Sequence, residues 1–314
     1  MKQIFATAIP TARRVLAFIL ALAATVRVNA DETQKSFTSP EAAVAALTTA
    51  VMTTNRAELR IIFGPAADKL ENPDPVQAAK ELAAFASAVH EKQRLVRESD
   101  HFVLEVGDDS WPFPVPIMKA NGRWYFNTED GLDELLNRRI GENELETLNF
   151  VRTYVQAQRE YASRDRNGDD VLQYAQKIIS TPGAKDGLFW SPDLDGEISP
   201  LGPFAADAAD EGYKKNQKNP DQRPQPFHGY YFKILTRQGK YAPGGKHGYI
   251  TNGKMIDGFA LVAWPAQYGN SGIMTFIVNQ QGRVYQKDLG AKTAKAAEAM
   301  KAYDPDKTWA LSED

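Results

Sequence analysis

The sequence of 314 residues contains no cysteine and only four histidines. The absence of cysteine excludes disulfide bonds, a lipid anchor on a thiol and zinc sites built from thiolates. The histidines show no HExxH or paired spacing, which a histidine-based zinc site would need; they are His90, His101, His228 and His247. The GxSxG, Walker-type and dinucleotide-binding fingerprints are also missing. No motif therefore indicates a particular catalytic chemistry.

Long hydrophobic runs are confined to the N-terminus. Basic residues precede an apolar core of 12 residues, Val15–Val26, and the small-residue cleavage site Val28-Asn29-Ala30 follows. The core is shorter than the roughly 20 residues that span a bilayer, so a cleaved signal peptide, residues 1–30, is favoured over an uncut membrane anchor. Nothing after residue 30 is apolar for long enough to cross a membrane. We expect a periplasmic or secreted protein, cut after Ala30.

An excess of charge of one sign is also lacking. Cleavage removes four basic residues and no acidic one, which leaves 33 Lys and Arg against 40 Asp and Glu and a net charge of −7. A mildly acidic surface of mixed signs does not favour nucleic acid or anionic lipid as a partner. The 284 residues that remain after cleavage fit two domains better than one.

The first predicted domain, residues 31–141, starts with helices and continues with a meander of strands. Ser39 is the N-cap of the first helix, and Asn121-Gly122, between two apolar runs, is the strongest hairpin signal in the chain. Four strands are predicted, at Leu95–Glu98, Phe102–Val106, Phe113–Met118 and Trp124–Asn127. A helix around Leu132–Ile140 follows, and Gly141 is expected to end it.

The second predicted domain, residues 142–290, is built on a helix from Asn143 to Ser163. Asn143 with Glu146 three residues later resembles a capping box. Two apolar stripes leave the helix little polar arc, so we expect it to be covered on more than one side. The stripes are formed by Leu148, Val151 and Val155 and by Phe150, Tyr154, Ala157 and Tyr161.

The remainder of this domain is predicted to combine short helices with a sheet. Helices are expected at Val171–Ile179 and near Pro203–Tyr213, and a C-terminal helix and tail, residues 291–314, end the chain. Four antiparallel strands are predicted, at Tyr230–Thr236, Phe259–Trp264, Ile273–Asn279 and Arg283–Lys287. Helices and antiparallel strands in separate runs give an α+β fold for both domains.

Several long segments occur in one order along the chain. They are SPEAAVAAL at Ser39–Leu47, DDSWPFPVPIMK at Asp108–Lys119, NRRIGENE at Asn137–Glu144, YVQAQREYASRDRNGD at Tyr154–Asp169, HGYYFKILT at His228–Thr236 and the closing block Gly258–Gly290. In these segments the chain after Phe37 resembles a family of secreted bacterial proteins known only as domain of unknown function 2950. The resemblance implies an envelope or secreted location. The family has no established activity, so no catalytic residues follow from it.

Each predicted domain also resembles a known fold. From Asn143, the segment NELETLNFVRTYVQAQREYAS and the strands GYYFKIL, FALVAWP and TFIVNQQGRVY are similar to the globular head of type IV pilins and pseudopilins. An α+β domain stands where pilins have a long apolar N-terminal helix, so this resemblance implies the head fold and not the filament. The first domain, with WPFPVPIMKANGRWYF in its meander, is similar to the nuclear-transport-factor-2-like cone, which hosts both enzymes and binding modules.

The segment DRNGDD, residues 165–170, places oxygen-bearing side chains at alternate positions, as the start of a calcium loop does. Asp165, Asn167 and Asp169 fit positions one, three and five. Position six is aspartate rather than glycine, and position twelve is Gln176, which has no bidentate carboxylate. We therefore expect at most a weak calcium site and no other cofactor. The alternative is a solvated turn between two helices.

Three other segments have ordinary structural explanations. The glycine-rich stretch Gly239–Gly258 lacks the Gly-Lys-Ser/Thr ending of a phosphate loop, which favours a long turn between strands. The prolines of Trp111–Pro116 are typical of an edge strand protected from further pairing. Asp108 and Asp109 precede it, and a paired-carboxylate enzyme would need a second acid across a cleft.

Two functional hypotheses remain. The first is a non-catalytic exported protein that binds or scaffolds an envelope protein or polymer through its loops and its pilin-like head. The second is a hydrolase of envelope polymers that uses carboxylates of the first domain. No nucleophile–base pair and no set of metal ligands can be recognised in the sequence, which favours the non-catalytic hypothesis. A deep cleft with two facing acids, or a carboxylate beside a histidine, would favour the second.

Overall fold

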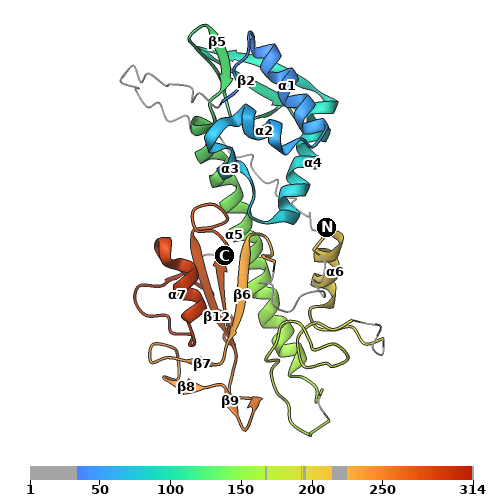
Figure 1. Ribbon diagram of the computed structural model, residues 1–314. Helices are drawn as coiled ribbons and strands as arrows, with labels where there is room; N and C mark the ends of the chain where they lie inside the picture. The colour runs from blue at the N-terminus through green and yellow to red at the C-terminus, as the bar shows by residue number, and fades with distance from the viewer. Residues whose placement is uncertain (1–33, 167, 192, 194–195, 214–224, 313–314) are drawn as a thin grey trace, which may run out of the picture.

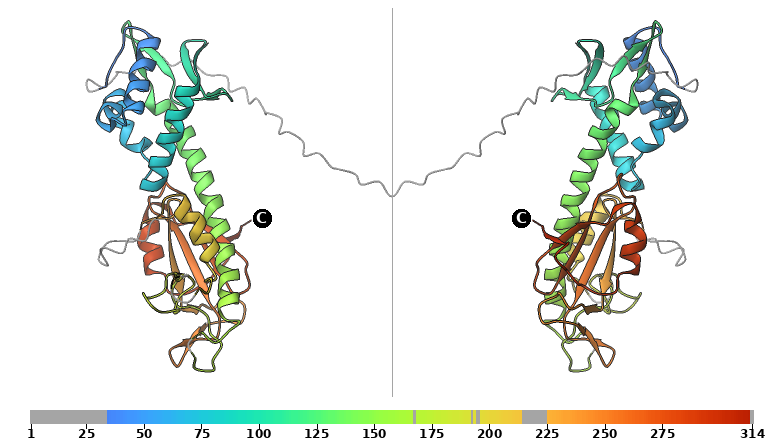
Figure 2. Two further views of the ribbon diagram at one scale, coloured as in Figure 1. Left: turned by 90° about the vertical axis from the view of Figure 1, so that its right-hand side faces the viewer. Right: turned by 90° about the vertical axis from the view of Figure 1, so that its left-hand side faces the viewer.

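The computed structural model describes residues 34–166, 168–191, 193, 196–213 and 225–312. The predicted signal peptide lies outside these residues. Figure 1 shows two bodies stacked end to end along one long helix, α5 (Thr128–Tyr161), and the turned views agree (Figure 2). The N-terminal body consists of the residues before α5 and the first turns of α5, and the C-terminal body consists of the second half of α5 and the residues after it. Both bodies combine helices with antiparallel sheets, which confirms the α+β class.

The helices of the N-terminal body start at side-chain caps. The Ser39 hydroxyl accepts a hydrogen bond from the backbone amide of Ala42 at 3.1 Å, as predicted, and Asp74 caps a later helix in the same way. Two short helices between them are not predicted by the sequence pattern. The helices are α1 (Pro40–Met52), α2 (Arg56–Phe63), α3 (Ala67–Leu70) and α4 (Pro75–Glu91), with a 3-10 turn, η1 (Gly64–Ala66), before α3.

An antiparallel sheet completes the N-terminal body, in the order β1-β2-β4-β5 with β3 paired to β2. Its strands are β1 (Gln93–Glu98), β2 (His101–Val106), β3 (Trp111–Pro112), β4 (Ile117–Ala120) and β5 (Arg123–Phe126). The predicted strand Phe113–Met118 is irregular up to Ile117, because the prolines before it cannot donate to a ladder. Asn121 and Gly122 have φ angles of 51° and 78°, as a two-residue type I′ turn requires, so the predicted hairpin is confirmed.

Helix α5 runs for 34 residues through the predicted break at Gly141, which is therefore wrong. A glycine inside a helix costs about 1 kcal/mol relative to alanine, and tertiary contacts of the neighbouring turns offset this. Asn143 is not a cap; its side-chain amide donates to the carbonyl of Ser271 at 2.9 Å. The carboxylate of Glu144 accepts two backbone amides at the start of a strand, both at 2.9 Å. The predicted domain limit after residue 141 falls within this helix.

A second antiparallel sheet forms the C-terminal body, in the order β14-β13-β12-β11-β6. The four predicted strands are present, and β14 is an unpredicted fifth. They are β6 (Tyr230–Leu235), β11 (Ala260–Pro265), β12 (Met274–Asn279), β13 (Tyr285–Asp288) and β14 (Ala310–Leu311).

Helices cover both faces of this sheet (Figure 2). Neighbouring residues of a strand point to opposite faces. The ring of Phe232 on β6 lies 4.3 Å from the ring of Phe150 on α5. The Nζ atom of Lys233, the next residue, donates to the carbonyl of Ala297 on α7 (Thr293–Ala299) at 2.8 Å. The sheet is therefore enclosed between α5 and α7.

The segments that connect α5 to the sheet are mostly irregular. The predicted helix Val171–Ile179 is wrong, because Gln158 of α5 bonds both backbone groups of Ala175 at 2.9 Å and holds this stretch extended. Helix α6 (Gly202–Asp210) confirms the helix predicted near Pro203–Tyr213. Short elements complete the body; they are β7 (Arg237–Gln238), β8 (His247–Gly248), β9 (Ile250–Thr251), β10 (Lys254–Met255) and the 3-10 turn η3 (Gly290–Lys292).

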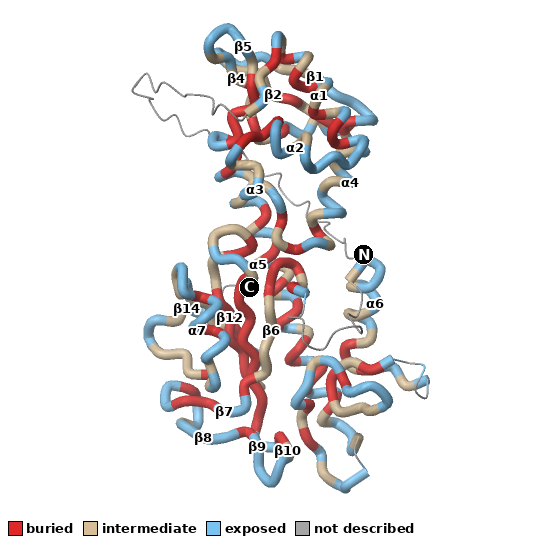
Figure 3. Tube along the Cα trace, viewed as in Figure 1, coloured by how far each residue is buried: buried red, intermediate tan, exposed pale blue. Residues whose placement is uncertain are grey.

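Each body has its own hydrophobic core (Figure 3). In the C-terminal core, Tyr154 and Val155 are 0% and 3% exposed although they lie on different stripes of α5. The hydroxyl of Tyr161 donates to the carbonyl of Lys185 at 2.7 Å. The second half of α5 is thus the buried spine that the two stripes predict. Among the described residues, no helix combines the length and apolar character needed to cross a bilayer.

Candidate functional site

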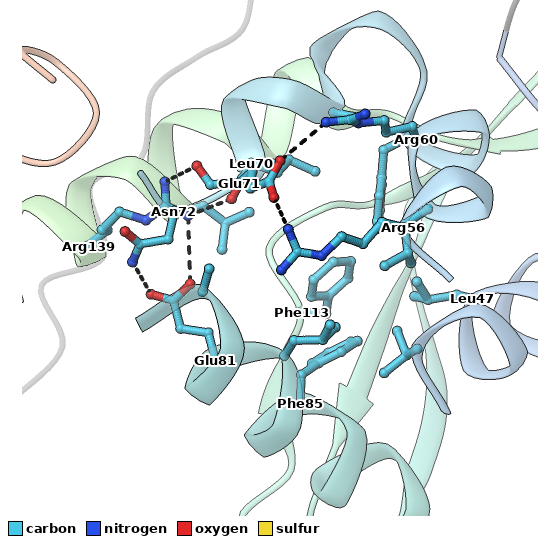
Figure 4. A pocket seen from close by; sticks show the side chains of 17 residues that line it. Leu47, Arg56, Arg60, Leu70, Glu71, Asn72, Glu81, Phe85, Phe113 and Arg139 are labelled. Carbon is cyan, nitrogen blue, oxygen red and sulfur yellow. Dashed lines mark hydrogen bonds and ion pairs between the residues drawn. The ribbon is translucent and has the colours of Figure 1, made fainter. Parts of the chain in front are cut away.

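A largely apolar cavity of about 220 Å³ lies in the N-terminal body, among α1, α2, α4 and the segment before β4 (Figure 4). Its walls are aliphatic and aromatic side chains that include Leu47, Val51, Phe63, Leu82, Phe85 and Phe113. Residues three or four positions apart share a helix face, so α1 and α4 each turn one apolar face to the cavity. The rings of Phe85 and Phe113 lie 5.0 Å apart.

Charged side chains lie along one side of the cavity (Figure 4). Arg56 and Arg60, one turn apart on α2, both pair with Glu71, and the Arg60–Glu71 distance is 3.4 Å. Arg60 also lies 3.1 Å from Asp68. The side chains of Arg56 and Arg60 are 55% and 61% exposed. Ion pairs this exposed contribute only about 0–1 kcal/mol each, so the arginines can rearrange around a ligand at little cost.

Arg139 of α5 lies on the same side and joins the two bodies. Its Nη2 atom donates to the carbonyl of Leu70 at 2.6 Å, and its Nη1 atom donates to Oδ1 of Asn270, in the loop between β11 and β12, also at 2.6 Å. The side chain is 7% exposed. Its Nε atom is buried and meets no hydrogen-bond acceptor among the described residues. Arg139 is therefore a buried cation at the edge of the cavity, and its Nε atom is enclosed by protein atoms.

Glu81 of α4 lies beside Arg139, with Oε2 at 3.9 Å from Nη2. Its Oε1 atom accepts a hydrogen bond from the side-chain amide of Asn72 at 2.6 Å. Burial against the cavity wall raises the pKa of the Glu81 carboxyl above its usual range, and Arg139 and Asn72 lower it by less. The side chain is 48% exposed, so Glu81 can exchange a proton with solvent.

This arrangement can hold a small amphipathic molecule, because binding pockets are mostly apolar with a few placed polar groups. The volume is below the roughly 300–1,000 Å³ of pockets for drug-sized ligands, so a compact ligand fits best. The same side also contains two carboxylates, Glu71 and Glu81. A carboxyl with a raised pKa is suited to general acid catalysis, which keeps a hydrolytic role open.

A second polar cluster lies at the junction of the two bodies and includes His228. The Nε2 atom of His228 lies 3.1 Å from Oε2 of Glu211, and its Nδ1 atom accepts from the amide of Gln77 at 3.3 Å. The hydroxyl of Tyr213 donates to Oδ2 of Asp74, the cap of α4, at 2.8 Å. A carboxylate beside a histidine is thus present. His228 is 6% exposed and does not line the cavity, so this cluster joins the two bodies outside the cavity.

The predicted calcium residues Asp165 and Asp169 fall in one turn after α5, and Asn167 lies outside the described residues. The two oxygens of Asp165 accept backbone amides of the same turn at 2.9 and 2.8 Å. Oδ2 of Asp169 lies 2.9 Å from Nζ of Lys254, which a cation would have to displace. These bonds are typical of a solvated turn, and the weak calcium site stays a prediction.

The other candidates from the sequence are not brought together. His90 and His247 are exposed, and His101 lies near the carboxylates of Glu98 and Asp100. Asp108 and Asp109 are exposed in the turn before β3 and do not line the cavity. Within the described ranges, no three Asp, Glu or His side chains are grouped to hold a metal ion.

Sequence reasoning does not find the charged residues of the cavity. Arg56, Arg60, Glu71, Glu81 and Arg139 come from separate helices and one helix end. Arg56, Arg60 and Glu71 lie where no helix is predicted from the sequence. Glu81 and Arg139 look like residues on the polar face of a predicted helix, where charges are usually solvated. Only Arg139 carries a signal, because it lies within the NRRIGENE segment of the family resemblance.

The fold and the cavity describe an α+β protein with a largely apolar pocket in its N-terminal body. Comparison with known families matches residues 34–311 to the family described as Protein of unknown function (DUF2950). The match covers most of the chain, so the protein belongs to this family, which confirms the resemblance. No curated protein and no solved structure matches the chain.

Proposed function

We propose that the protein is an exported, non-catalytic binding protein of the bacterial envelope, and that the cavity of its N-terminal body holds the ligand. The cavity carries this proposal. Ligand sites are concave and mostly apolar with a few placed polar groups, and this cavity offers about 220 Å³ of space among mainly apolar side chains. The exposed arginines on one side supply polar contacts for a ligand that is not wholly apolar.

Export is part of the proposal and rests on the sequence. The charged start, the apolar core Val15–Val26 and the cleavage site at Ala30 support release into the periplasm or the medium. Intact-mass measurement of the exported product is expected to place the N-terminus at Asp31. Full-length protein in the membrane fraction would contradict this part.

A matched pair of alanines on α4 tests the pocket. Ala78 lines the cavity, and Ala79, the next residue, is exposed. We expect the mature protein to bind a naphthylamine dye that fluoresces in apolar surroundings. Ala78→Trp should weaken dye binding by about tenfold or more, a loss of about 1.4 kcal/mol, because the indole fills the cavity. Ala79→Trp is the control, and equal dye binding by the two folded variants would contradict the proposal.

A carboxylate-dependent hydrolase of envelope polymers is the second candidate. The raised pKa of Glu81 favours it, because a general acid must keep its proton until it meets the substrate. Glu71 supplies the second acid on the cavity side. Soluble fragments released from purified cell-wall polymer by the mature protein, and not by Glu81→Gln, would establish this function. The apolar walls give the binding role more support.

The C-terminal body has the scaffolding role in this proposal. Its long buried helix packed on an antiparallel sheet supports the pilin-like interpretation. Its partner would be an envelope protein or polymer, held by loops at the end distant from the cavity. Capture of that partner by the mature chain, with the cavity filled by Ala78→Trp, would separate the two roles.

A further inference from the structure

Carboxylates offset the charge of the two α2 arginines on the charged side of the cavity. Glu71 pairs with both Arg56 and Arg60, and the Arg60–Glu71 distance is 3.4 Å (Figure 4). Arg60 has a second partner in Asp68, 3.1 Å away. Glu71 is therefore the residue that joins the two guanidiniums and neutralises part of their charge.

Arg139, the third arginine of the cavity, has partners of its own. Its guanidinium lies 3.9 Å from the carboxylate of Glu81. It also donates to the backbone carbonyls of Leu70 at 2.6 Å and Glu71 at 3.4 Å. Three arginines and two glutamates line the cavity, and Asp68 beside the α2 arginines is a third carboxylate. The positive and negative charges of this side are therefore balanced.

The α2 arginines nevertheless keep donors that face solvent. An arginine has five N–H donors and no acceptor. Arg56 donates to Glu71 through Nη1 and is 55% exposed, and Arg60 contacts two carboxylates and is 61% exposed. A hydroxyl or carbonyl oxygen of a ligand can accept a hydrogen bond from one of the remaining donors while the ion pairs stay in place.

We infer that the cavity selects an uncharged amphiphile with one hydroxyl or carbonyl group, and that Glu71 sets this selectivity by neutralising Arg56 and Arg60. The polar group would lie at the α2 arginines and the apolar body against Phe85 and Phe113. This inference rests on the proposed function, since it names the ligand class of the same cavity. A cavity of about 150 Å³ can hold benzene, so about 220 Å³ suits a single ring or a medium-length alkyl chain.

The balance of charges disfavours an ionic ligand of either sign. An anionic head beside the α2 arginines would also lie near Glu71 and Asp68, and a cationic head beside these carboxylates would lie near the arginines. Neither head would meet a net opposite charge, and each would lose part of its hydration. A hydroxyl group loses less hydration and needs one donor only.

Displacement of the naphthylamine dye from the mature protein tests the inference. Octanol, octanoate and octylammonium have the same chain length and differ in charge. At pH 7 we expect octanol to displace the dye from the wild-type protein at a concentration at least about tenfold lower than either ion, because the hydration that an ion loses is not repaid.

Two variants with opposite charge changes test the role of Glu71. Glu71→Gln leaves an excess of positive charge, so octanoate should displace the dye at a concentration at least about fivefold lower than from the wild-type protein. Arg60→Gln leaves an excess of negative charge and should favour octylammonium instead. Octanol should change by less than about twofold in both, because it carries no charge. Glu58→Gln is the control, because Glu58 lies on α2 but pairs with Lys35 and does not line the cavity.

The outcomes separate the inference from the proposed function. Octanoate or octylammonium that displaces the dye from the wild-type protein as well as octanol does overturns the inference and leaves the pocket standing. An octanoate-to-octanol ratio that is the same in Glu71→Gln, Glu58→Gln and the wild-type protein also overturns it. Absence of dye binding by the wild-type protein overturns both the inference and the proposed function.

Discussion

The two bodies of the protein are closed to different degrees around their cores. In α4 of the N-terminal body, only Gln77 and Val89 are buried among 17 residues. In β11 of the C-terminal body, all six residues are buried, because α5 and α7 cover the two faces of the sheet. The N-terminal body thus keeps space between its helices, and the C-terminal body is a closely packed support. This difference fits the ligand-binding role proposed for the N-terminal body. The C-terminal body supplies Asn270, which holds Arg139 in place.

The largest effect is expected where the closed core is broken. Val155 is 3% exposed, and Val155→Asp would bury an unpaired charge, which should destabilise the C-terminal body by more than about 4 kcal/mol and unfold it. Tyr154→Ala should cost about 3–5 kcal/mol. The exposed Gln156→Asp, on the same turn, is the control. Thermal melts measure all three, and unchanged melting temperatures for the first two would show that α5 is not the spine of a core.

Two glycines of α5 should respond with opposite signs. A Cβ atom on Gly131 would lie 2.6 Å from Cα of Val115, so Gly131→Ala should destabilise the protein by about 1–3 kcal/mol through overpacking. A Cβ atom on Gly141 would meet open space, so Gly141→Ala should stabilise it by about 0.5–1 kcal/mol. Urea unfolding checks both. Equal effects would mean that the helix does not approach the Pro114–Val115 segment closely.

Glu81 beside the cavity should make the stability of the protein depend slightly on pH, an effect that the closed core of the C-terminal body does not produce. The pKa of Glu81 is raised above its ordinary 4.5, so the folded state holds this proton more tightly than the unfolded state. The stability that Glu81 contributes is therefore present at low pH and lost as pH rises through the folded pKa. Relative to Glu81→Gln, the wild-type melting temperature should rise as pH falls from 7 to 4. Glu91→Gln, exposed on the same helix, is the control. A melting-temperature difference between the wild-type protein and Glu81→Gln that does not change with pH would contradict the prediction.

The smallest effect is expected at the turn after α5. Asp165 and Asp169 already accept amide and lysine donors, so calcium should bind with a dissociation constant of about 1 mM or weaker. Calorimetry with calcium alone measures this, and Asp165→Ala should change little. Tight binding that Asp165→Ala abolishes would show a true metal site in the C-terminal body.

Local signals predict local structure in this chain, and distant contacts decide the rest. The Ser39 cap and the Asn121-Gly122 hairpin depend on residues a few positions apart, and both are confirmed. The continuation of α5 through Gly141 depends on contacts such as Asn143 to Ser271, which lies 128 positions away. A period of three or four residues cannot show such partners.

The cavity could not be predicted from the sequence, and the reason differs from that for α5. An apolar face on α1 and on α4 predicts packing, and nothing in the pattern shows whether the faces meet or leave space between them. The charged side is drawn from α2, α4 and α5. Glu71 and Glu81 do belong to the first predicted domain, in which carboxylates for the alternative hydrolase were expected, although neighbouring charges such as Asp108 remain exposed.

Because α5 runs unbroken from one body into the other, it fixes the rotation of the C-terminal body about the helix axis relative to the N-terminal body. Each residue of an α-helix adds about 100° of rotation and 1.5 Å of rise. One residue inserted between Arg139 and Phe150 would turn the C-terminal body by about 100° about the helix axis and carry Asn270 away from Arg139. Seven inserted residues would restore the rotation to within about 20°, yet separate the bodies by about 10 Å. Changes in chain length among relatives are therefore expected in the irregular segments and not in this stretch of α5.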